Sequence, residues 1–373
     1  MLLITPAMRG GSWQSVSRLF DLLPNDIDKT ILTLGRKNSS TYRVVRFPYP
    51  SYERLAPIIE SNFASSILYF LPWYIVIVVF DLFARPKVVL VNGMSSIVPL
   101  LIMKRITRQK IILSFHSYLN SPFTGLARVV KGFLSQADLA TANSTGSRDN
   151  LSLVMPEVKI RVVEHVPARL FFAELDRDAI REKYHAENKL VILYVGRLDI
   201  DKRCDKLIRV CEVLNNSDDV LFVFVGEGAL SPFINQLQKT RPNILSLGYV
   251  SERSRMHELY VLADLTWSFA DETYLALPAL ESLASGTPIV IPELAAVRFK
   301  DRSGLKVDPS LVPIDVGWIV SDTDEVTLAR WLQTLDKDAL REKRGNCRKY
   351  AAQRYFEGRL SPILMDDFVR LFR

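Results

Sequence analysis

Two cations follow a strongly apolar run of the chain, and together they could bind a diphosphate. Residues 190–195 predict a buried strand, Gly196 turns the chain, and Arg197 and Lys202 follow within the same loop. In open α/β sheets, ligands bind at the carboxyl ends of the strands. An arginine offers a fixed fork of donors and a lysine a mobile point charge, a suitable pair for clamping a diphosphate. Taken alone, the pair is better explained as two solvated surface cations.

A second candidate site lies in residues 270–290, where a loop rich in acids leads into a short helix. Pro278 suits the first helical position and Gly286 the position just after the helix. The backbone N–H groups near the start of this helix would form a phosphate site. Glu281, one turn in, would grip sugar hydroxyls or, alternatively, stabilise the helix dipole while facing water. Its apolar neighbours favour the first reading, because a carboxylate beside them needs a partner.

The run "FVGEGALSPF" places Gly226 and Gly228 at the end of another predicted strand. Glycines at such a position let a ligand approach the backbone closely. The dinucleotide pattern GxGxxG is not completed here or elsewhere in the chain. A nicotinamide-dependent dehydrogenase is therefore poorly supported.

Short apolar runs rich in Val and Ile alternate with helical segments along the whole chain. Continuous rather than alternating hydrophobicity is typical of strands buried on both faces, and the helices between them predict βαβ units. The chain has 373 residues, enough for two domains at roughly 100–200 residues each. The sequence therefore predicts an α/β protein with two doubly wound, Rossmann-like parallel-sheet domains facing a cleft. The predicted divisions are 1–172, 173–350 and a C-terminal helix over 351–373 that packs back on the first domain.

Charge divides the chain unequally. Residues 1–170 hold 20 Lys and Arg against 10 Asp and Glu, whereas the remainder holds 28 against 31. The basic half predicts an anionic partner or an anionic membrane surface. Nucleic acid is not favoured, because the cations are dispersed without interleaved aromatic residues. Three cysteines and four histidines show neither disulfide nor metal-site spacing, which indicates a reducing, cytoplasmic context, and we expect no signal peptide and no metal.

Residues 61–80 carry no charge and are long enough to cross a bilayer. A crossing would leave part of one sheet on the far side of the membrane, and Pro72 interrupts the helix. A buried or interfacial helix is therefore favoured over a span. Two readings of that helix stay open: a core helix of the first domain, or a surface that dips into a membrane beside the acceptor site.

Several motifs together resemble the retaining glycosyltransferases of family 4, which have the GT-B fold. They occur in the family's order and spacing: "GRLDIDK", "VGEG", "LGYV" and "ETYLALPALESLASGTPIV". The resemblance is strong over residues 190–345 and weaker over 1–170. There "RGGSWQSVSRL" is similar to the loop after the first strand and "FHSYL" to the acceptor-side histidine segment.

The resemblance implies a donor-binding second domain and an acceptor-binding first domain. Arg197 and Lys202 would bind the diphosphate of a nucleotide sugar, and Glu281 the ribose. The backbone around Gly226, Gly228 and Val250 would surround the nucleoside. The amides around Ala276 and Leu277 would contact the phosphates and the sugar. On the first domain, His116 would line the acceptor side near the transferred sugar, and Gly10 and Gly11 would allow closure over the donor phosphates.

Three departures from the family pattern affect this interpretation. Eight residues before Glu281 stands Thr273, so the expected acid is displaced to Glu272 or Asp271. Ala276 replaces the usual glycine, which restricts the loop backbone. The pair His165–Val166 replaces Asn-Gly at the hinge.

The predicted function is retaining transfer of a sugar, as a hexosyltransferase, from a nucleoside-diphosphate donor to a hydroxyl of a lipid-diphosphate-linked or glycan acceptor. Glu272 and His116 are the predicted catalytic residues. No cofactor or metal is expected, because side-chain cations would offset the phosphate charge. We expect a cytoplasmic protein, peripheral at the inner face of the cell membrane. The alternatives are a catalytically weak or inactive partner subunit of the same fold and a different nucleotide-sugar enzyme, such as an epimerase or a phosphorylase.

Overall fold

The computed structural model of the chain divides into two compact units, Met1–Glu164 with Leu360–Arg373, and His165–Arg359. The sequence placed this division after residue 172 instead. The structure describes all residues except 6–12, 14–15, 18–19, 21–26, 35–41, 48–62, 93–96, 116–131, 133, 215–216, 270–274, 294–312, 314, 322, 356–361 and 373.

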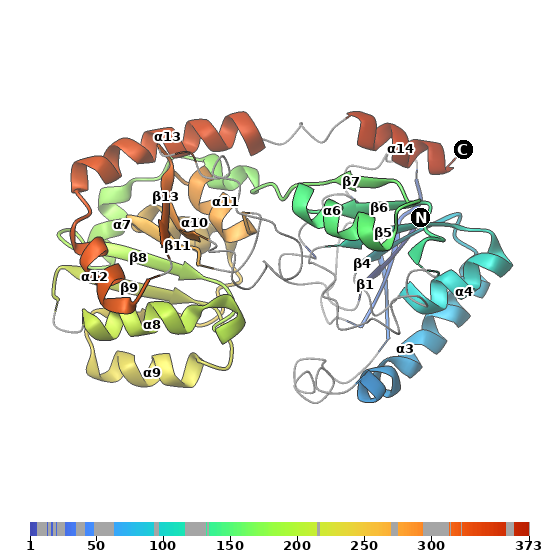
Figure 1. Cartoon of the computed structure of the whole chain (residues 1–373), viewed down its shortest axis with the longest axis horizontal. Helices are drawn as coiled ribbons and strands as arrows, with labels where there is room; N and C mark the ends of the chain where they lie inside the picture. Colours follow the sequence, from blue (N-terminus) through green and yellow to red (C-terminus); the bar gives the residue numbers. More distant parts are fainter. Residues whose placement is uncertain are drawn as a thin grey trace. The chain divides into compact units, whose positions relative to one another are not determined.

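The first unit is built on a seven-stranded parallel sheet in the order β3-β2-β1-β4-β5-β6-β7 (Figure 1). Its strands are β1 (Leu2–Thr5), β2 (Thr30–Thr33), β3 (Arg43–Arg46), β4 (Val88–Asn92), β5 (Lys110–Phe115), β6 (Leu139–Ala142) and β7 (Ile160–Val162). The helices described in it are α3 (Phe63–Ala84), α4 (Ile97–Thr107), α6 (Thr145–Val154) and α14 (Pro362–Phe372). The central strands are buried along their length, as their continuous apolar runs predict.

The second unit contains a six-stranded parallel sheet in the order β10-β9-β8-β11-β12-β13. Its strands are β8 (Leu190–Val195), β9 (Val220–Val225), β10 (Ile244–Ser246), β11 (Leu265–Trp267), β12 (Ile289–Glu293) and β13 (Gly317–Ser321). Its helices are η2 (Arg169–Phe172), α7 (Arg177–Lys183), η3 (Ile200–Lys202), α8 (Cys204–Val213), α9 (Ser231–Thr240), α10 (Arg253–Leu262), α11 (Leu277–Ala284), α12 (Glu325–Gln333) and α13 (Lys337–Tyr355).

Both sheets confirm the predicted pair of doubly wound, Rossmann-like domains. The strand order reverses beside β1 in the first sheet and beside β8 in the second. Such a reversal leaves a crevice at the carboxyl ends of the strands, where open α/β sheets bind their ligands. In the second unit this edge includes the ends of β8 and β11, and the loops after them carry the residues singled out from the sequence.

The chain end differs from the single helix predicted over 351–373. α13 ends at Tyr355 and belongs to the second unit, where Cys347 and Ala351 are fully buried in the core around α10 and α11. α14 belongs to the first unit. Its Phe368 is buried with Leu3 and Val88, and its Asp367 accepts hydrogen bonds from Lys159 and Arg161. The packing of Phe368 and the ion pairs of Asp367 with Lys159 and Arg161 therefore hold α14 on the first sheet.

The uncharged segment 61–80 overlaps α3, a 22-residue helix that contains Pro72. Among the described residues, no helix combines the length and the hydropathy that a membrane crossing requires. Trp73 and Ile77 of α3 are fully buried in the core of the first unit. At least one face of α3 is therefore core.

Asp81, on the last turn of α3, is a buried carboxylate whose two oxygens lack a hydrogen-bond partner among the described residues. Burial raises its pKa from 3.8 to about 6, and the nearby Gln109 amide offsets only part of this rise. A raised pKa means that the folded protein binds this proton more tightly than the unfolded chain. The contribution to stability is therefore present below about pH 4 and is lost as the pH rises through about 6.

We expect Asp81→Asn to stabilise the first unit at neutral pH, because the amide removes the buried charge. The gain should grow by about 1.4 kcal/mol per pH unit between roughly pH 4 and 6 and level off near 3 kcal/mol above that. Urea unfolding of both proteins at pH 5, 6, 7 and 8 measures it. A difference in unfolding free energy that does not vary with pH would contradict the assignment.

Asp138→Asn serves as a control of opposite sign. Burial tends to raise the pKa of Asp138, but hydrogen bonds from the Lys104 ammonium and the Ile111 N–H, together with Lys110, lower it overall. Its stabilising effect is present at neutral pH and is lost on acidification. The Asp138→Asn variant should therefore be less stable than the wild-type protein at pH 7.

Candidate functional site

The loop after β8 brings Arg197 and Lys202 to the carboxyl edge of the second sheet, as predicted. The Tyr194 hydroxyl donates to the Arg197 carbonyl oxygen at 2.7 Å and fixes the start of the loop. The guanidinium of Arg197 lies 2.7 Å from the Asp199 carboxylate, with 59% of the side chain exposed. Lys202 ends the short helix η3 and is half-buried. Asp199 thus restrains the position of Arg197, while more than half of the Arg197 side chain stays exposed.

Asp199 also ties this cationic loop to the neighbouring turn after β9. Its second carboxylate oxygen accepts from the Ala229 N–H at 2.6 Å. The Leu198 N–H donates to the Glu227 carbonyl, and the Leu230 N–H donates back to the Leu198 carbonyl, at 3.1 and 2.8 Å. The two loops therefore form one hydrogen-bonded layer at the sheet edge.

Gly226 and Gly228 are required by this layer itself. Gly226 has φ +138°, and a Cβ atom there would lie 1.8 Å from the Gly196 carbonyl oxygen. A Cβ on Gly228 would lie 2.5 Å from the Asp199 carboxylate. The sequence predicted that these glycines admit a ligand, whereas in the structure they admit the neighbouring loop of the same chain. Their role around a nucleoside stays a prediction.

Arg203 is a third cation of the same loop, and the sequence reasoning passed over it. It has φ +54°, a left-handed conformation, and its guanidinium lies 5.9 Å from the ring centroid of Phe269. Phe269 follows β11, the strand beside β8, and its ring stacks on Trp267. Adjacency to Lys202 in the motif was the available signal. The contact with Phe269 gives Arg203 a structural role as well, because it joins the loops after β8 and β11.

α11 starts at the same edge of the sheet, after the loop that follows β11. Its first residue is Leu277 and its second is Pro278, one position later than predicted for the proline. Ala276 stands at the N-cap with extended backbone angles and makes no side-chain cap. Gly286 follows the helix with φ +81°, which confirms its predicted position. No side chain among the described residues caps the start of α11, and the binding of an anion there stays a prediction.

Glu281 of α11 is buried, with 8% of its surface exposed. The Tyr260 hydroxyl of α10 donates to its carboxylate at 3.2 Å. Burial, and then the charge of Glu281, raise the pKa of Tyr260 well above its usual value, so this hydroxyl stays protonated. The water-facing alternative for Glu281 is therefore wrong, and the partner that the sequence argument required is Tyr260.

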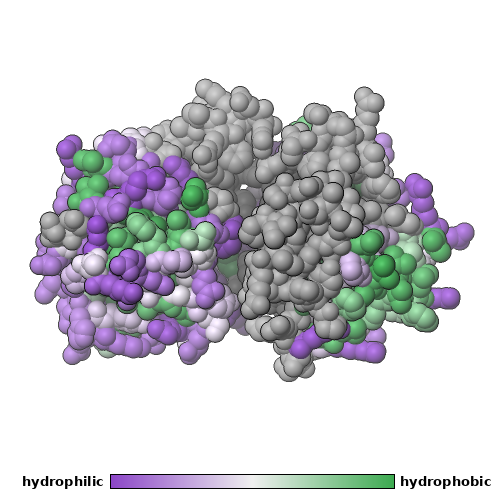
Figure 2. Space-filling view, turned by 90° about the horizontal axis from the view of Figure 1, so that it is seen from below, coloured by the Kyte–Doolittle hydropathy of each residue, from purple (hydrophilic) through white to green (hydrophobic). Residues whose placement is uncertain are grey.

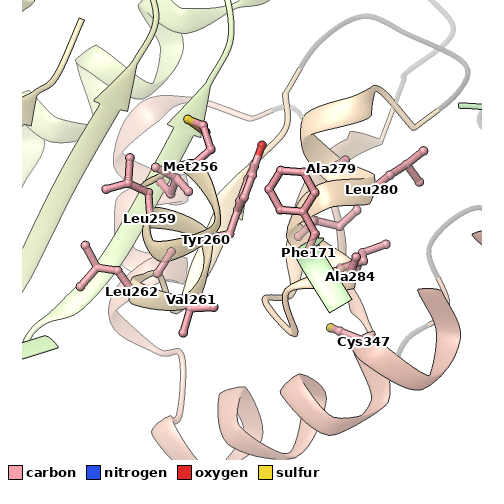
Figure 3. Packing of buried hydrophobic residues seen from close by; sticks show 14 of the residues in the cluster. Phe171, Met256, Leu259, Tyr260, Val261, Leu262, Ala279, Leu280, Ala284 and Cys347 are labelled. Carbon is pink, nitrogen blue, oxygen red and sulfur yellow. The ribbon is translucent and has the colours of Figure 1, made fainter. Parts of the chain in front are cut away.

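Tyr260 is itself held in place by packing. Its ring lies between α10 and α11 beside Phe171 of η2, at a centroid distance of 5.8 Å (Figure 3). The cluster around it includes Leu259, Ala279 and Leu280. Aromatic edge contacts of this kind restrict the ring and hence the direction of its hydroxyl. The Tyr260 hydroxyl, fixed by this packing, therefore orients the Glu281 carboxylate.

The remaining predicted residues are distributed as follows. Val250 follows β10 and is half-buried against the core that contains Tyr260. His165, at the predicted hinge, is buried at the start of the second unit. Four predicted site residues lie outside the described residues: Gly10, Gly11, His116 and Glu272.

A pocket of about 430 Å³ lies at the opposite end of α11, lined by Ser285, Gly286 and several arginines. Arg344 and Arg177 both donate to the Val261 carbonyl at the end of α10, at 3.2 and 3.1 Å. These arginines satisfy carbonyl groups that a helix terminus leaves without partners. The pocket is therefore explained by helix capping and is separate from the sheet edge.

Among the described residues, no cluster of His, Cys, Asp and Glu could hold a metal ion. The cysteines at 204, 211 and 347 are buried free thiols. Burial raises the pKa of Cys204 to about 12, so this thiol is not a thiolate nucleophile at neutral pH. The chemistry of the described edge therefore rests on cations, helix N–H groups and Glu281.

Residues 176–354, which carry Arg197, Lys202 and α11 with Glu281, match the family of glycosyl transferases group 1. Over 119 residues the chain is 29% identical to a GDP-mannose-dependent alpha-(1-6)-phosphatidylinositol dimannoside mannosyltransferase of Mycobacterium tuberculosis, covering 32% of this chain and 31% of the relative. It is also 29% identical over 178 residues to the alpha-monoglucosyldiacylglycerol synthase of Streptococcus pneumoniae, covering 43% and 39%. The aligned part spans less than half the length of each relative.

Solved structures match over the whole chain. The HepE protein of Anabaena, in complex with UDP and glucose, has a TM-score of 0.72 at 16% identity and covers 100% of this chain and 98% of its own. Sucrose-phosphate synthase from Thermosynechococcus elongatus has a TM-score of 0.70 at 15% identity, with 100% and 98% covered. Residues 176–354 are thus similar to the group 1 glycosyl transferases, and the two units together have the fold of the GT-B glycosyltransferases.

Proposed function

We propose that this protein transfers a sugar from a nucleoside-diphosphate donor to a hydroxyl of a lipid-linked acceptor, with retention at the anomeric carbon. One observation carries the proposal. The cationic loop after β8 and the start of α11, one turn ahead of Glu281, lie at the carboxyl edge of the same sheet, within the segment that matches the glycosyl transferases. A nucleotide sugar presents an anionic diphosphate between two groups rich in hydroxyls. Cations, helix N–H groups and a carboxylate are the complementary partners.

The reaction that suits these groups is displacement at the anomeric carbon. The bond from this carbon to the phosphate oxygen breaks, and the acceptor oxygen bonds to the carbon on the same face. The acceptor proton passes to the departing phosphate, which offsets part of the negative charge that the diphosphate gathers as the anomeric bond breaks. Arg197, Lys202 and the start of α11 would stabilise that charge without a metal ion. Glu281, held by Tyr260, would position the ribose.

A lipid-linked acceptor is favoured by two observations. The first half of the chain carries the surplus of cations, and the two curated relatives named above are a phosphatidylinositol mannoside transferase and a glucosyldiacylglycerol synthase. We propose a diphosphate-bearing lipid as acceptor and contact of the first unit with the cytoplasmic face of a membrane. A hexose is the proposed transferred group.

The test is incubation of the full-length protein with a panel of nucleotide sugars and a polyprenyl-diphosphate sugar. Released nucleoside diphosphate and an extended lipid, with the donor's anomeric configuration in its proton NMR spectrum, are expected. Donor binding without turnover would support the partner-subunit alternative instead. Conversion of the donor sugar in the absence of acceptor would support an epimerase.

The displaced acid is tested in the same assay with Glu272→Gln and a matched Asp271→Asn. If Glu272 replaces the family's acid, Glu272→Gln should lower turnover at least tenfold while Asp271→Asn leaves it nearly unchanged. The reverse ranking would assign the role to Asp271. Equal activity in both variants would remove the acid from the proposed mechanism.

A further inference from the structure

α3 of the first unit has one buried face and, opposite it, an exposed apolar face. One face consists of the buried residues Trp73, Ile77 and Asp81, spaced four apart. At about 100° per residue, the opposite face lies about 180° away around the helix. That second face is exposed, with relative exposures of 46% at Val79, 57% at Ile75 and 87% at Phe83, and it also includes Leu71 and Leu82.

This exposed face is unusual for a helix on the surface of a soluble domain. Such a helix places charged or polar residues opposite its buried stripe, whereas a helix that is apolar all round has an apolar environment on both sides. From Leu71 to Ala84, the only charged residue of α3 is the buried Asp81. α4 packs beside α3 and extends the exposed face with Ile106, which is 67% exposed. In Figure 2 this apolar surface is the green area over α3 and α4, at the right of the view.

Cations border the exposed face at the C-terminal ends of both helices. Arg85 and Arg108 follow α3 and α4 in left-handed conformations, with φ +43° and +58°. Lys87 and Arg105 are exposed close to them in the sequence. Within the described part of the chain, these cations make no ion pair, whereas Lys104 and Lys110 both pair with Asp138. The border is therefore positively charged.

We propose that α3 lies flat on a bilayer that contains anionic lipid, with its exposed face among the acyl chains and its border cations on the headgroups. This inference gives a surface to the membrane contact proposed above and rests on that proposal. The charges beside the exposed face favour a bilayer with anionic lipid over a second copy of this chain. Two copies of this face would bring like charges together, whereas anionic headgroups around an apolar interior match both the border and the centre.

The topology fits this orientation. In a βαβ unit the helix runs antiparallel to its strands, so an α3 that lies in the membrane plane keeps the strands of the first sheet roughly parallel to the membrane. The carboxyl edge of that sheet then stays about one helix layer, roughly 10 Å, above the lipid. A lipid-linked acceptor would reach this edge without leaving the bilayer.

The experiment is flotation of the full-length protein with phosphatidylcholine vesicles, with or without 30% phosphatidylglycerol, in the absence of any nucleotide sugar. We expect partitioning that is at least tenfold stronger onto the anionic vesicles and that weakens as salt is raised. Equal or absent binding to the two kinds of vesicle would overturn the proposal. Because no sugar transfer is measured, failure here is distinct from failure of the proposed reaction.

The face is tested with Ile75→Glu/Phe83→Glu, both at exposed positions. The matched control is Leu153→Glu on α6, since Leu153 is also exposed, at 70%, in the same unit. The double variant should lower partitioning at least tenfold, and the control less than twofold. Thermal unfolding of each variant establishes that it is folded.

The border is tested with Lys87→Glu/Arg105→Glu, against Arg255→Glu, an exposed cation of the second unit. Removing each border cation should weaken partitioning onto anionic vesicles about fivefold, with a smaller salt dependence. Wild-type partitioning in both double variants would refute the assignment of α3. A wild-type dimer that Ile75→Glu/Phe83→Glu converts to monomers would identify a second copy as the occupant instead.

Discussion

Alanine in place of Lys202 should lower the turnover number for sugar transfer by about 100- to 1,000-fold while leaving the protein folded. In the proposed reaction, negative charge gathers on the departing diphosphate as the anomeric bond breaks. A cation held beside that charge stabilises the transition state more than the bound donor, so its loss appears mainly in the turnover number. Lys202 is half-buried at the end of η3, where Lys202 N–H donates to the Asp199 carbonyl at 3.2 Å. The backbone of the loop therefore survives truncation of the side chain.

Arg197→Ala should also lower the turnover number for sugar transfer. Arg197 is more exposed than Lys202, so part of its charge is screened by solvent. We therefore expect a smaller loss, about 10- to 100-fold. Arg197→Lys should recover only part of the activity, because a lysine supplies the charge without the planar fork of donors.

Arg209→Ala is the matched control for both cations. Arg209 is an exposed arginine of α8, bound to Asp205 and Glu325. Its loss removes a positive charge from the same unit away from the loop, and turnover should stay within about twofold. Steady-state kinetics with a saturating acceptor and varied donor measure all of these variants. Near-normal turnover in both Lys202→Ala and Arg197→Ala would remove the diphosphate clamp from the mechanism.

The sequence predicted the strands of both sheet interiors and also the outer strands β7 and β10. β8 and β9 read as unbroken apolar runs because helices cover the sheet on each side. The sequence reasoning missed β3 and β13, which are the other outer strands of their sheets. β3 has exposed arginines at both ends of a two-residue apolar core. Edge strands of this kind have one unpaired side and need little continuous hydrophobicity, so a search for apolar runs passes over them.

The site was predictable where function depends on position after a strand. Arg197, Lys202 and the start of α11 follow apolar runs directly, and parallel strands bring such loops to one edge. The partner of Glu281 was not predictable, because Tyr260 lies on a different helix, 21 residues earlier. The need for a partner follows from burial, whereas its identity follows from tertiary packing.

The Gly226–Gly228 motif likewise could not be interpreted from the sequence alone. A strand followed by Gly-Glu-Gly suggests close approach of something to the backbone, and sequence alone does not say what approaches. The structure places the Gly196 carbonyl against Gly226 and the Asp199 loop against Gly228. The motif therefore holds the cationic loop in place, whether or not a nucleoside also contacts it.

Gly226→Ala should consequently destabilise the second unit by more than about 4 kcal/mol, the largest single-residue effect that we expect on stability. Two causes add. The backbone angle of +138° is one that side-chain-bearing residues rarely adopt. In addition, the new methyl group would overlap the Gly196 carbonyl oxygen at 1.8 Å, so the backbone of one of the two loops would have to shift.

Gly248→Ala separates these two causes. Gly248 also has a positive φ, +62°, but a Cβ atom there would meet no other atom within 4 Å. Only the strain of the positive φ angle remains, so we expect the free energy of unfolding to fall by about 1–2 kcal/mol. Urea unfolding followed by tryptophan fluorescence, to which buried Trp267 of the second unit contributes, compares the two variants. If Gly226→Ala unfolds at the same urea concentration as Gly248→Ala, the close approach of the two loops does not stabilise the fold. The hydrogen bonds between the two loops would then be sufficient to hold the β8 loop in place.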